Sequence, residues 1–248
     1  MHKKPSDLTT HATDTPLTIQ FASSSPLELS RAASLVQPFV SSVDLNCGCP
    51  QSWACAEGIG ASLMHQRDLV TSMIKAVKAR CGNQFCMSVK IRVHRDLRET
   101  VDFVRAVEGA GVDYIGVHGR LRSQRSSEPV DLEAIRLVKE SVACPVVANG
   151  DAFSLKDAER IAGCTGVDGV MSARGLQENP ALFAGFEKTP REAVRRFVEL
   201  AVRFPIPFAL VKQHVWDMTI GVLEKAERKE ILDVVDMLEL VDWVEEHV

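Results

Sequence analysis

A short stretch of the sequence, VDLNCGCP, carries two cysteines one residue apart behind an asparagine. Cys47 and Cys49 could bind a metal ion, form a disulfide, or act separately. Zinc sites are tetrahedral, and no second cysteine pair follows at a zinc-finger spacing, so the sequence predicts no metal site. A disulfide between these neighbours would close a small strained ring. We therefore interpret Cys49 as a single working thiol that exchanges a proton with a substrate, and Cys47 as a buried packing residue.

Other polar residues follow short apolar runs. Lys90 ends SVKIR, His118 stands between glycines in GVHGR, residues 149–151 read Asn-Gly-Asp, and Ala173 precedes Arg174. A lysine in a buried strand is costly unless it meets an anion or reaches solvent. An arginine beside loop amides suits a phosphate group, although a surface ion pair is the alternative. Together these residues indicate a site for a phosphate-bearing cofactor opposite a proton-donating cysteine.

The segments that position these residues alternate between two kinds. Short apolar runs predict six strands, at 17–22, 41–46, 86–93, 114–119, 144–150 and 167–173. Amphipathic segments between them predict helices at 25–40, 67–81, 97–111, 131–142 and 154–166. Repeated strand and helix predict a parallel α/β sheet of the (β/α)8 TIM-barrel type, in which polar residues at the carboxyl ends of strands share one mouth. A doubly wound sheet is the alternative, but no G-x-G-x-x-G follows the first strand.

The pattern changes near residue 187. The segments 189–204, 205–225 and 226–248 predict three helices without strands. We therefore expect two domains, a partial barrel over 1–186 and a small all-α domain over 187–248.

Composition sets the broad class of the protein. Hydrophobic residues make up 46% of the chain and the net charge is -4, so a nucleic-acid partner would need a local basic patch. An odd count of seven scattered cysteines favours a reducing compartment. No apolar run reaches the length of a membrane span, and the first residues lack a signal-peptide core. We expect a soluble cytoplasmic protein, with the nucleus left open.

The motifs, taken in order, resemble the tRNA-dihydrouridine synthases over nearly the whole chain. The matching segments are QFA, DLNCGCPQ with GIGASLM after it, SVKIR, VHGR, VVANGD and GVMSARGLQENPALF. Other flavin barrels, such as dihydroorotate dehydrogenases, share only parts of this set. The segments CGCPQSWACAEG and ARGLQENPALFAGFE are most similar to the eukaryotic branch that acts on positions 20a and 20b of the tRNA D-loop.

The resemblance implies an FMN enzyme that uses NADPH or NADH to reduce the C5–C6 double bond of a flipped-out uridine. It implies that Cys49 protonates C5 after hydride reaches C6. It assigns FMN binding to Gln20, Lys90, His118, Asn149, Gly150, Asp151, Ala173 and Arg174, and uracil binding to Asn46, Lys90, Arg92 and His118. We expect the protein to be a monomer whose C-terminal helices bind tRNA. On these helices the phosphate contacts would use Arg191, Arg195, Arg196, Arg203 and Lys212. At the barrel mouth they would use Arg120, Arg122 and Arg125.

The sequence departs from this family at its start. The family barrel begins with a strand carrying an APM-type segment and then a second strand, and neither is present here, so we expect an N-terminally shortened chain. Two other functions stay open. One is a non-catalytic or vestigial tRNA-binding homologue, and the other is a flavin barrel with a small-molecule substrate.

Overall fold

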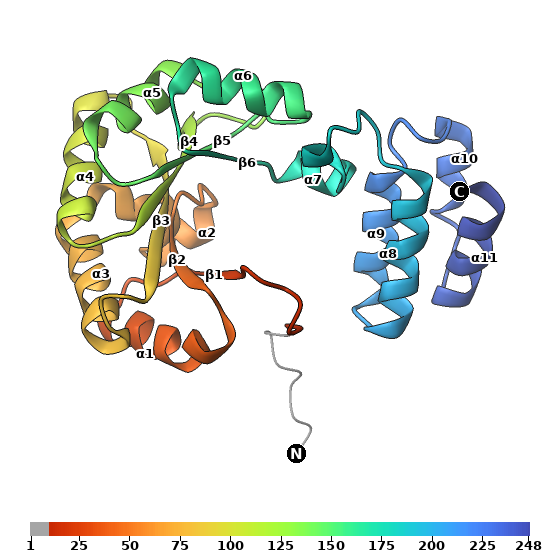
Figure 1. Cartoon of the computed structure of the whole chain (residues 1–248), viewed down its shortest axis with the longest axis horizontal. Coiled ribbons are helices and arrows are strands. Elements are labelled where there is room, and N and C mark those ends of the chain that lie inside the picture. Colours follow the sequence, from red (N-terminus) through yellow and green to blue (C-terminus); the bar gives the residue numbers. More distant parts are fainter. Residues whose placement is uncertain (1–9) are drawn as a thin grey trace. The chain divides into compact units, whose positions relative to one another are not determined.

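The computed structural model describes residues 10–248 of the chain (Figure 1). The sheet runs in the order β1-β2-β3-β4-β5-β6, and each neighbouring pair from β1 to β5 is parallel. Its strands are β1 (Thr18–Phe21), β2 (Ser42–Cys47), β3 (Cys86–Val93), β4 (Tyr114–Leu121), β5 (Val146–Asn149) and β6 (Gly169–Met171). All six predicted strands are thus confirmed, as is the α/β class, with ends that shift by a few residues. Whether this sheet is part of a closed (β/α)8 barrel stays a prediction.

A helix follows each strand from β1 to β5, and the five predicted long helices are confirmed. They are α1 (Pro26–Val36), α3 (Arg67–Cys81), α4 (Leu97–Gly109), α5 (Leu132–Ser141) and α6 (Leu155–Thr165). The end of the predicted helix 25–40 is a separate 3-10 turn, η1 (Gln37–Phe39). Sequence periodicity missed four short elements: α2 (Ser52–Ala56), η2 (Gly60–His65), α7 (Arg174–Glu178) and η3 (Leu182–Ala184). A segment of five or six residues completes fewer than two helical turns, so it has no measurable repeat.

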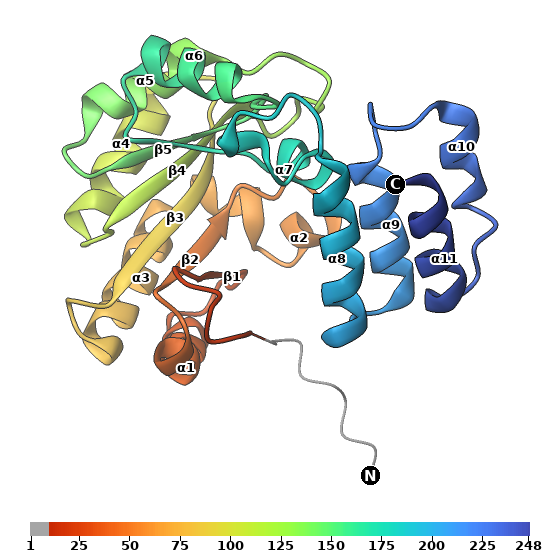
Figure 2. The ribbon, with the colours of Figure 1, turned by 45° about the vertical axis from the view of Figure 1, so that its right-hand side comes forward.

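The two faces of the sheet differ in chemistry because side chains alternate along each strand. On one face, Val43, Leu45, Val89 and Ile91 are fully buried. Figure 2 shows α3 and α4 beside strands β2 to β4. Burying each such aliphatic side chain contributes roughly 1.5–3 kcal/mol. The other face carries the polar residues of the predicted site.

The chain divides into two compact units. The first contains the described residues up to Asn149 together with Cys164–Gly169, and the second contains Gly150–Gly163 and Val170–Val248. The predicted domain boundary at residue 186 is a different division and stays a prediction. Among residues 10–248, no helix combines the length and apolar character needed to cross a lipid bilayer.

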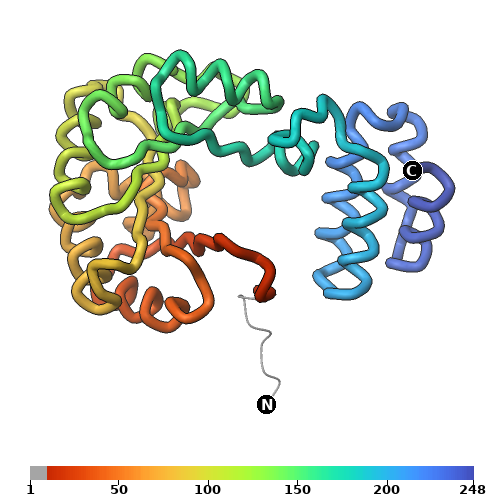
Figure 3. The backbone as a smooth tube through the Cα atoms, viewed as in Figure 1, coloured from red at the N-terminus to blue at the C-terminus, as the bar shows by residue number. Residues whose placement is uncertain are grey.

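The C-terminal part of the second unit contains four helices where the sequence predicted three. They are α8 (Arg191–Arg203), α9 (Phe208–Met218), α10 (Lys225–Glu230) and α11 (Met237–His247) (Figure 3). The prediction of one continuous helix over 226–248 was wrong, because α10 ends at Glu230 and α11 begins after its N-cap residue, Asp236. The Asp236 carboxylate accepts hydrogen bonds from the backbone N–H groups of Leu238 and Glu239 at 2.9 and 3.0 Å. That cap makes Asp236 a start signal rather than a mid-helix residue.

These helices enclose their own apolar core. The fully buried members include Val194, Val211, Val215, Ile231 and Leu240. They come from α8, α9, the α10–α11 link and α11, so the short helices are held by packing rather than by intrinsic helix stability.

We predict that Asp236→Ala lowers the free energy of unfolding by about 1 kcal/mol, the usual cost of losing an N-cap. Urea denaturation followed by circular dichroism measures this change. Asp233→Ala is the matched control, because Asp233 is an exposed carboxylate in the same link and caps no helix. Equal effects of both substitutions would contradict the assigned cap.

Candidate active site

Strand register brings most of the predicted site residues onto one face of the sheet. Residues two apart on a strand share a face, and parallel pairing places partners side by side. The resulting rows are Gln20–Asp44–Ser88, Asn46–Lys90–Gly116 and Arg92–His118–Asn149. Six residues predicted from widely separated motifs therefore lie on this polar face: Gln20, Asn46, Lys90, Arg92, His118 and Asn149.

The side chain of Asn46 links this face to the loop that carries Cys49. Its Oδ1 accepts hydrogen bonds from the backbone N–H groups of Gly48 at 3.0 Å and Cys49 at 2.9 Å. Its Nδ2 donates to Gln20 Oε1 at 2.9 Å, and Gln20 Nε2 donates to Asp44 Oδ2 at 2.7 Å. A continuous chain of hydrogen bonds thus runs from a buried carboxylate to the loop backbone at Cys49.

Asp44 begins this chain, and the sequence analysis did not identify it. Asp44 is 7% exposed, and its Oδ1 accepts a hydrogen bond from Ser88 Oγ. Burial raises the pKa of the Asp44 carboxyl, against the lowering by its hydrogen bonds from Ser88 and Gln20. An acidic residue in the middle of the apolar run SVDLN was the signal that could have revealed it, since such a residue needs a partner.

Lys90 lies in the middle of the polar face. Its Nζ donates to Asn149 Oδ1 at 2.7 Å, which joins β3 to the end of β5. Desolvation by burial lowers the pKa of the Lys90 ammonium from 10.5 to about 8, and the Asp44 carboxylate opposes this shift. Gly116 makes room for the stem, because a Cβ at that position would lie 2.7 Å from Lys90 Cδ. Lys90 is therefore a desolvated cation held in place on the sheet.

Arg120 fixes the protonation state of His118. Arg120 is 1% exposed, its Nε donates to the backbone carbonyl of Glu128 at 2.6 Å, and its NH1 donates to His118 Nε2 at 3.0 Å. A guanidinium cannot accept a hydrogen bond, so His118 Nε2 is the acceptor and the neutral ring carries its hydrogen on Nδ1. The expectation that Arg120 contacts tRNA phosphate is wrong, because the side chain is buried and serves His118.

The two cysteines of VDLNCGCP have different surroundings. Cys47 is fully buried, which confirms its packing role, whereas Cys49 is partly exposed. The Cys49 carbonyl accepts a hydrogen bond from Ala61 N–H at 2.8 Å. Gly60 permits this approach, because it has φ +63° and a Cβ there would lie 2.7 Å from the Cys49 oxygen. The η2 turn thus binds the carbonyl of Cys49, whereas Asn46 binds its N–H group.

Arg92 holds the same loop. Its Nε donates to the Gly48 carbonyl at 2.9 Å and its NH1 donates to the Leu121 carbonyl at 2.8 Å. Arg92 also lines a pocket of 480 Å³ in the first unit, together with Pro50 and the side chains of Arg95 and Arg122. A pocket lined by three arginines and by the carboxylates of Asp96 and Glu99 therefore borders the residue that follows Cys49.

The second unit brings together the predicted residues that follow β5 and β6. Arg174 NH2 lies 3.6 Å from Asp151 Oδ1, and the guanidinium lies over the ring of Phe153 at 5.0 Å. Asp151 has φ 54° and Gly150 has φ 123°, so the chain turns sharply here. A Cβ on Gly175 would lie 2.4 Å from the Ala152 carbonyl, which shows how closely α7 approaches this turn. Gly150, Asp151, Ala173 and Arg174 are thus neighbours, and the ion pair foreseen as the alternative for Arg174 is present.

Lys212 and Arg191, which the sequence analysis assigned to tRNA, donate to backbone carbonyls in the second unit. Lys212 Nζ donates to the carbonyls of Leu232 and Val234 at 2.6 and 2.7 Å. Arg191 NH1 donates to the carbonyl of His247 at 2.5 Å. Their charges hold the α10–α11 link and the end of α11.

Comparison with known proteins agrees with these motifs. The family model "Dihydrouridine synthase (Dus)" matches residues 1–237. The tRNA-dihydrouridine(20a/20b) synthase of Schizosaccharomyces pombe is 44% identical over 241 residues, which cover 97% of this chain and 74% of that protein. The tRNA-dihydrouridine(20a/20b) synthase-like protein of Homo sapiens is 40% identical over 245 residues, covering 98% of this chain and 77% of that protein.

A solved structure gives a more distant likeness. The old yellow enzyme homologue from Zymomonas mobilis aligns with a TM-score of 0.50 and 12% identity, over 64% of this chain and 50% of that one. That likeness concerns the fold alone. The family model over nearly the whole sequence, and relatives of this identity and coverage, show that the chain belongs to the dihydrouridine synthase family.

Proposed function

We propose that this chain is an FMN-dependent tRNA-dihydrouridine synthase that uses NAD(P)H to reduce the C5–C6 double bond of D-loop uridine, at position 20a or 20b. The relatives named above support the reaction and the position. The observation that carries the proposal is the hydrogen-bond chain from Asp44 through Gln20 and Asn46 to the backbone of Cys49.

The residues of the polar face fit a flavin. The ring of a flavin has carbonyl oxygens and nitrogens that need donors and acceptors, and Gln20, Lys90, His118 and Asn149 provide both. Lys90 is the strongest of these groups, because a desolvated ammonium gains most from an electron-rich partner. The close contact that a Cβ at Gly116 would make with Lys90 supports a site shaped around that side chain. When bound, FMN supplies hydride transfer.

In the second unit we assign the flavin phosphate to Arg174 with the backbone at Gly150, Asp151 and Ala173. Arg174 is 48% exposed, and an ion pair with an exposed partner contributes little, so exchanging the Asp151 carboxylate for a phosphate costs little. The guanidinium then keeps its stacking on Phe153 while its N–H groups turn to the new anion.

Cys49 is the proposed general acid. The uridine must leave the base stack to be reached, and we assign Asn46, Lys90, Arg92 and His118 to the uracil edge. As hydride adds to C6, the electron pair of the C5–C6 bond takes the thiol proton of Cys49 at C5, which leaves a thiolate to be reprotonated by solvent. Asn46 orients this step through the loop backbone, because it holds the N–H groups of Gly48 and Cys49.

The partner in this proposal is tRNA, bound by a monomeric chain in the cytoplasm. Arg122 and Arg95 line the pocket that borders Pro50, and their charges suit the phosphates on either side of a flipped nucleotide. Arg195, Arg196 and Arg203 remain the candidates on α8.

Cys49→Ala should lower dihydrouridine formation at least about 100-fold, the contribution expected of a general acid. Nucleoside analysis of digested tRNA measures the product, while loss of NADPH absorbance should show that flavin reduction persists. Cys47→Ala is the matched control. It should keep the activity and lower the free energy of unfolding by about 1 kcal/mol, because Cys47 only packs. Purified protein that is colourless yet still shifts tRNA in a gel would contradict the proposal and favour the non-catalytic function.

Lys90→Met should reduce flavin binding and change how stability depends on pH. The folded Lys90 titrates near pH 8 and the unfolded one near 10.5, so the unfolded state binds more protons between these values. Stability contributed through Lys90 therefore rises as pH increases from about 8 to 10.5, by up to about 3 kcal/mol.

Urea denaturation of the flavin-free protein under reducing conditions measures this rise as the difference between wild type and Lys90→Met at each pH. Lys75→Met, which removes an exposed lysine of α3, is the control and should give a flat difference. A flat difference for Lys90→Met as well would show that the ammonium is not desolvated.

A further inference from the structure

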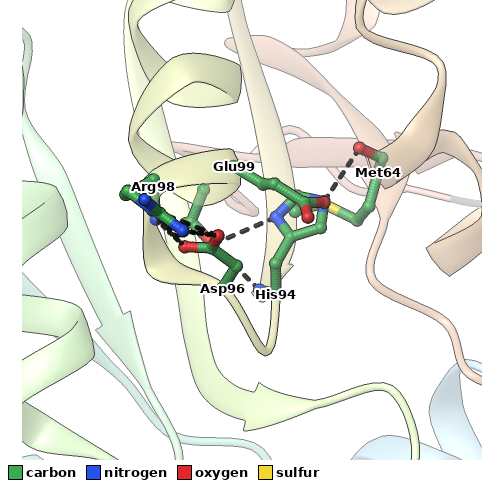
Figure 4. Close-up of polar contacts among 6 residues, drawn as sticks. Met64, His94, Asp96, Arg98 and Glu99 are labelled. Atoms are coloured by element: carbon green, nitrogen blue, oxygen red, sulfur yellow. Dashed lines mark hydrogen bonds and ion pairs between the residues drawn. The ribbon is translucent and has the colours of Figure 1, made fainter.

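Two histidines and a glutamate converge in the first unit, just beyond the end of β3, where they line the pocket that Arg92 and Pro50 also line. His65 ends η2, His94 follows β3, and Glu99 lies in the first turn of α4. One ligand atom from each lies within 4.8 Å of the other two, and His94 Nε2 lies 4.0 Å from Glu99 Oε2. Figure 4 shows Glu99 beside the His94 ring. The sequence analysis predicted no metal site, and it did not consider these residues.

His94 is the fixed member of this cluster. It is 8% exposed, and its Nδ1 lies 3.0 Å from Thr100 Oγ1, which also accepts the backbone N–H of His94 at 2.8 Å. Its Nε2 lies 3.0 Å from the Met64 carbonyl, on the side of Glu99. Histidines that bind metals have one ring nitrogen on a protein oxygen, as Nδ1 is here, and leave the other to the ion. Nε2 is engaged by the Met64 carbonyl, so an ion at Nε2 must replace that hydrogen bond, and the carbonyl must move aside or become a further ligand.

The other two ligands can reach the ion. Metal bonds of about 2.0–2.2 Å place neighbouring ligands roughly 3.4 Å apart, so separations of 4.0–4.8 Å must shorten by about 1 Å. Glu99 has a side chain 58% exposed and His65 is exposed, so both can rotate without disturbing the core. The rings of His65 and His94 already meet edge to face, with centroids 5.2 Å apart.

The surroundings favour a cation. The cluster opens into a pocket of 420 Å³ that is also lined by Asp68 and Asp102, and the nearby Arg67 lies 3.3 Å from the Asp68 carboxylate. The open side leaves room for a water as the fourth ligand.

We propose that His65, His94 and Glu99 form a binding site for a divalent transition-metal ion such as Zn²⁺. Two imidazoles and one carboxylate select such ions over Mg²⁺ and Ca²⁺, which prefer oxygen ligands. The ion would clamp η2 to the start of α4. Because Ala61 of η2 donates to the Cys49 carbonyl, the same clamp would stiffen the loop that carries the thiol.

Thiols complicate a simple zinc titration, because the chain has seven free cysteines. Cobalt(II) separates the two kinds of site, since thiolate ligands give an intense charge-transfer band in the near ultraviolet that imidazole and carboxylate ligands do not. Full-length protein, kept reduced with a phosphine, is titrated with CoCl₂ and then with ZnCl₂, MgCl₂ or CaCl₂ as competitors.

We expect one equivalent of Co²⁺ with visible d–d absorption and no thiolate band, displaced by Zn²⁺ but not by Mg²⁺ or Ca²⁺. His65→Ala and Glu99→Gln should each weaken Co²⁺ binding at least roughly 10- to 100-fold. Glu230→Gln is the matched control and should change nothing, because it removes another carboxylate that lies beside a histidine, His247, at 3.1 Å. Failure to bind Co²⁺, a spectrum dominated by the thiolate band, or unchanged affinity in His65→Ala and Glu99→Gln would each overturn the proposal.

Discussion

The hydrogen bonds of the Asn46 side chain hold the rest of the proposed site in place. One carboxamide accepts two backbone N–H groups from the loop after β2 and donates to Gln20, which in turn donates to Asp44. A hydrogen bond to a charged group contributes about 1.5–3 kcal/mol, and a buried partner left without one costs a comparable amount. Breaking one of these hydrogen bonds would leave a buried group unpaired. The network therefore fixes the backbone at Cys49 to strand β2 of the sheet.

The same network explains why a buried aspartate is tolerated in a strand. Asp44 is removed from water, and the resulting penalty is visible in its raised pKa. Hydrogen bonds from Ser88 and Gln20 offset part of that penalty, and the charge of the Lys90 ammonium offsets a smaller part. The two charged groups stabilise each other, since the Asp44 carboxylate likewise raises the pKa of Lys90 against the effect of burial.

The Cys49 loop has a second support, which comes from η2 and from the neighbouring strand β3. Ala61 donates to the Cys49 carbonyl, Arg92 donates to the Gly48 carbonyl, and Gly60 lets the two chain segments approach. A loop fixed at both its N–H groups and its carbonyls has few ways to move. A metal ion at the end of η2 would act on this second support, so the proposed clamp and the proposed acid are mechanically connected although they lie on different elements.

The sequence by itself determined the elements and the residue types. Alternating apolar runs and amphipathic segments located all six strands and five helices, and the motif letters located Asn46, Cys49 and Lys90. These properties are local, so a linear pattern is enough to predict them.

Only the tertiary structure decided which of these residues meet. Strand register placed Asp44 beside Gln20 and Ser88. Rotamer and burial placed Arg120 beside His118 on the same strand, and the positions of η2 and α4 placed His65 and Glu99 near His94. The split between α10 and α11 likewise depended on Asp236 finding its cap. The contacts of Asp44 and of His65 join segments far apart in the chain, so no local pattern of residues specifies them. The Asp236 cap and the Arg120–His118 pair are short-range, and there rotamer and burial made the choice.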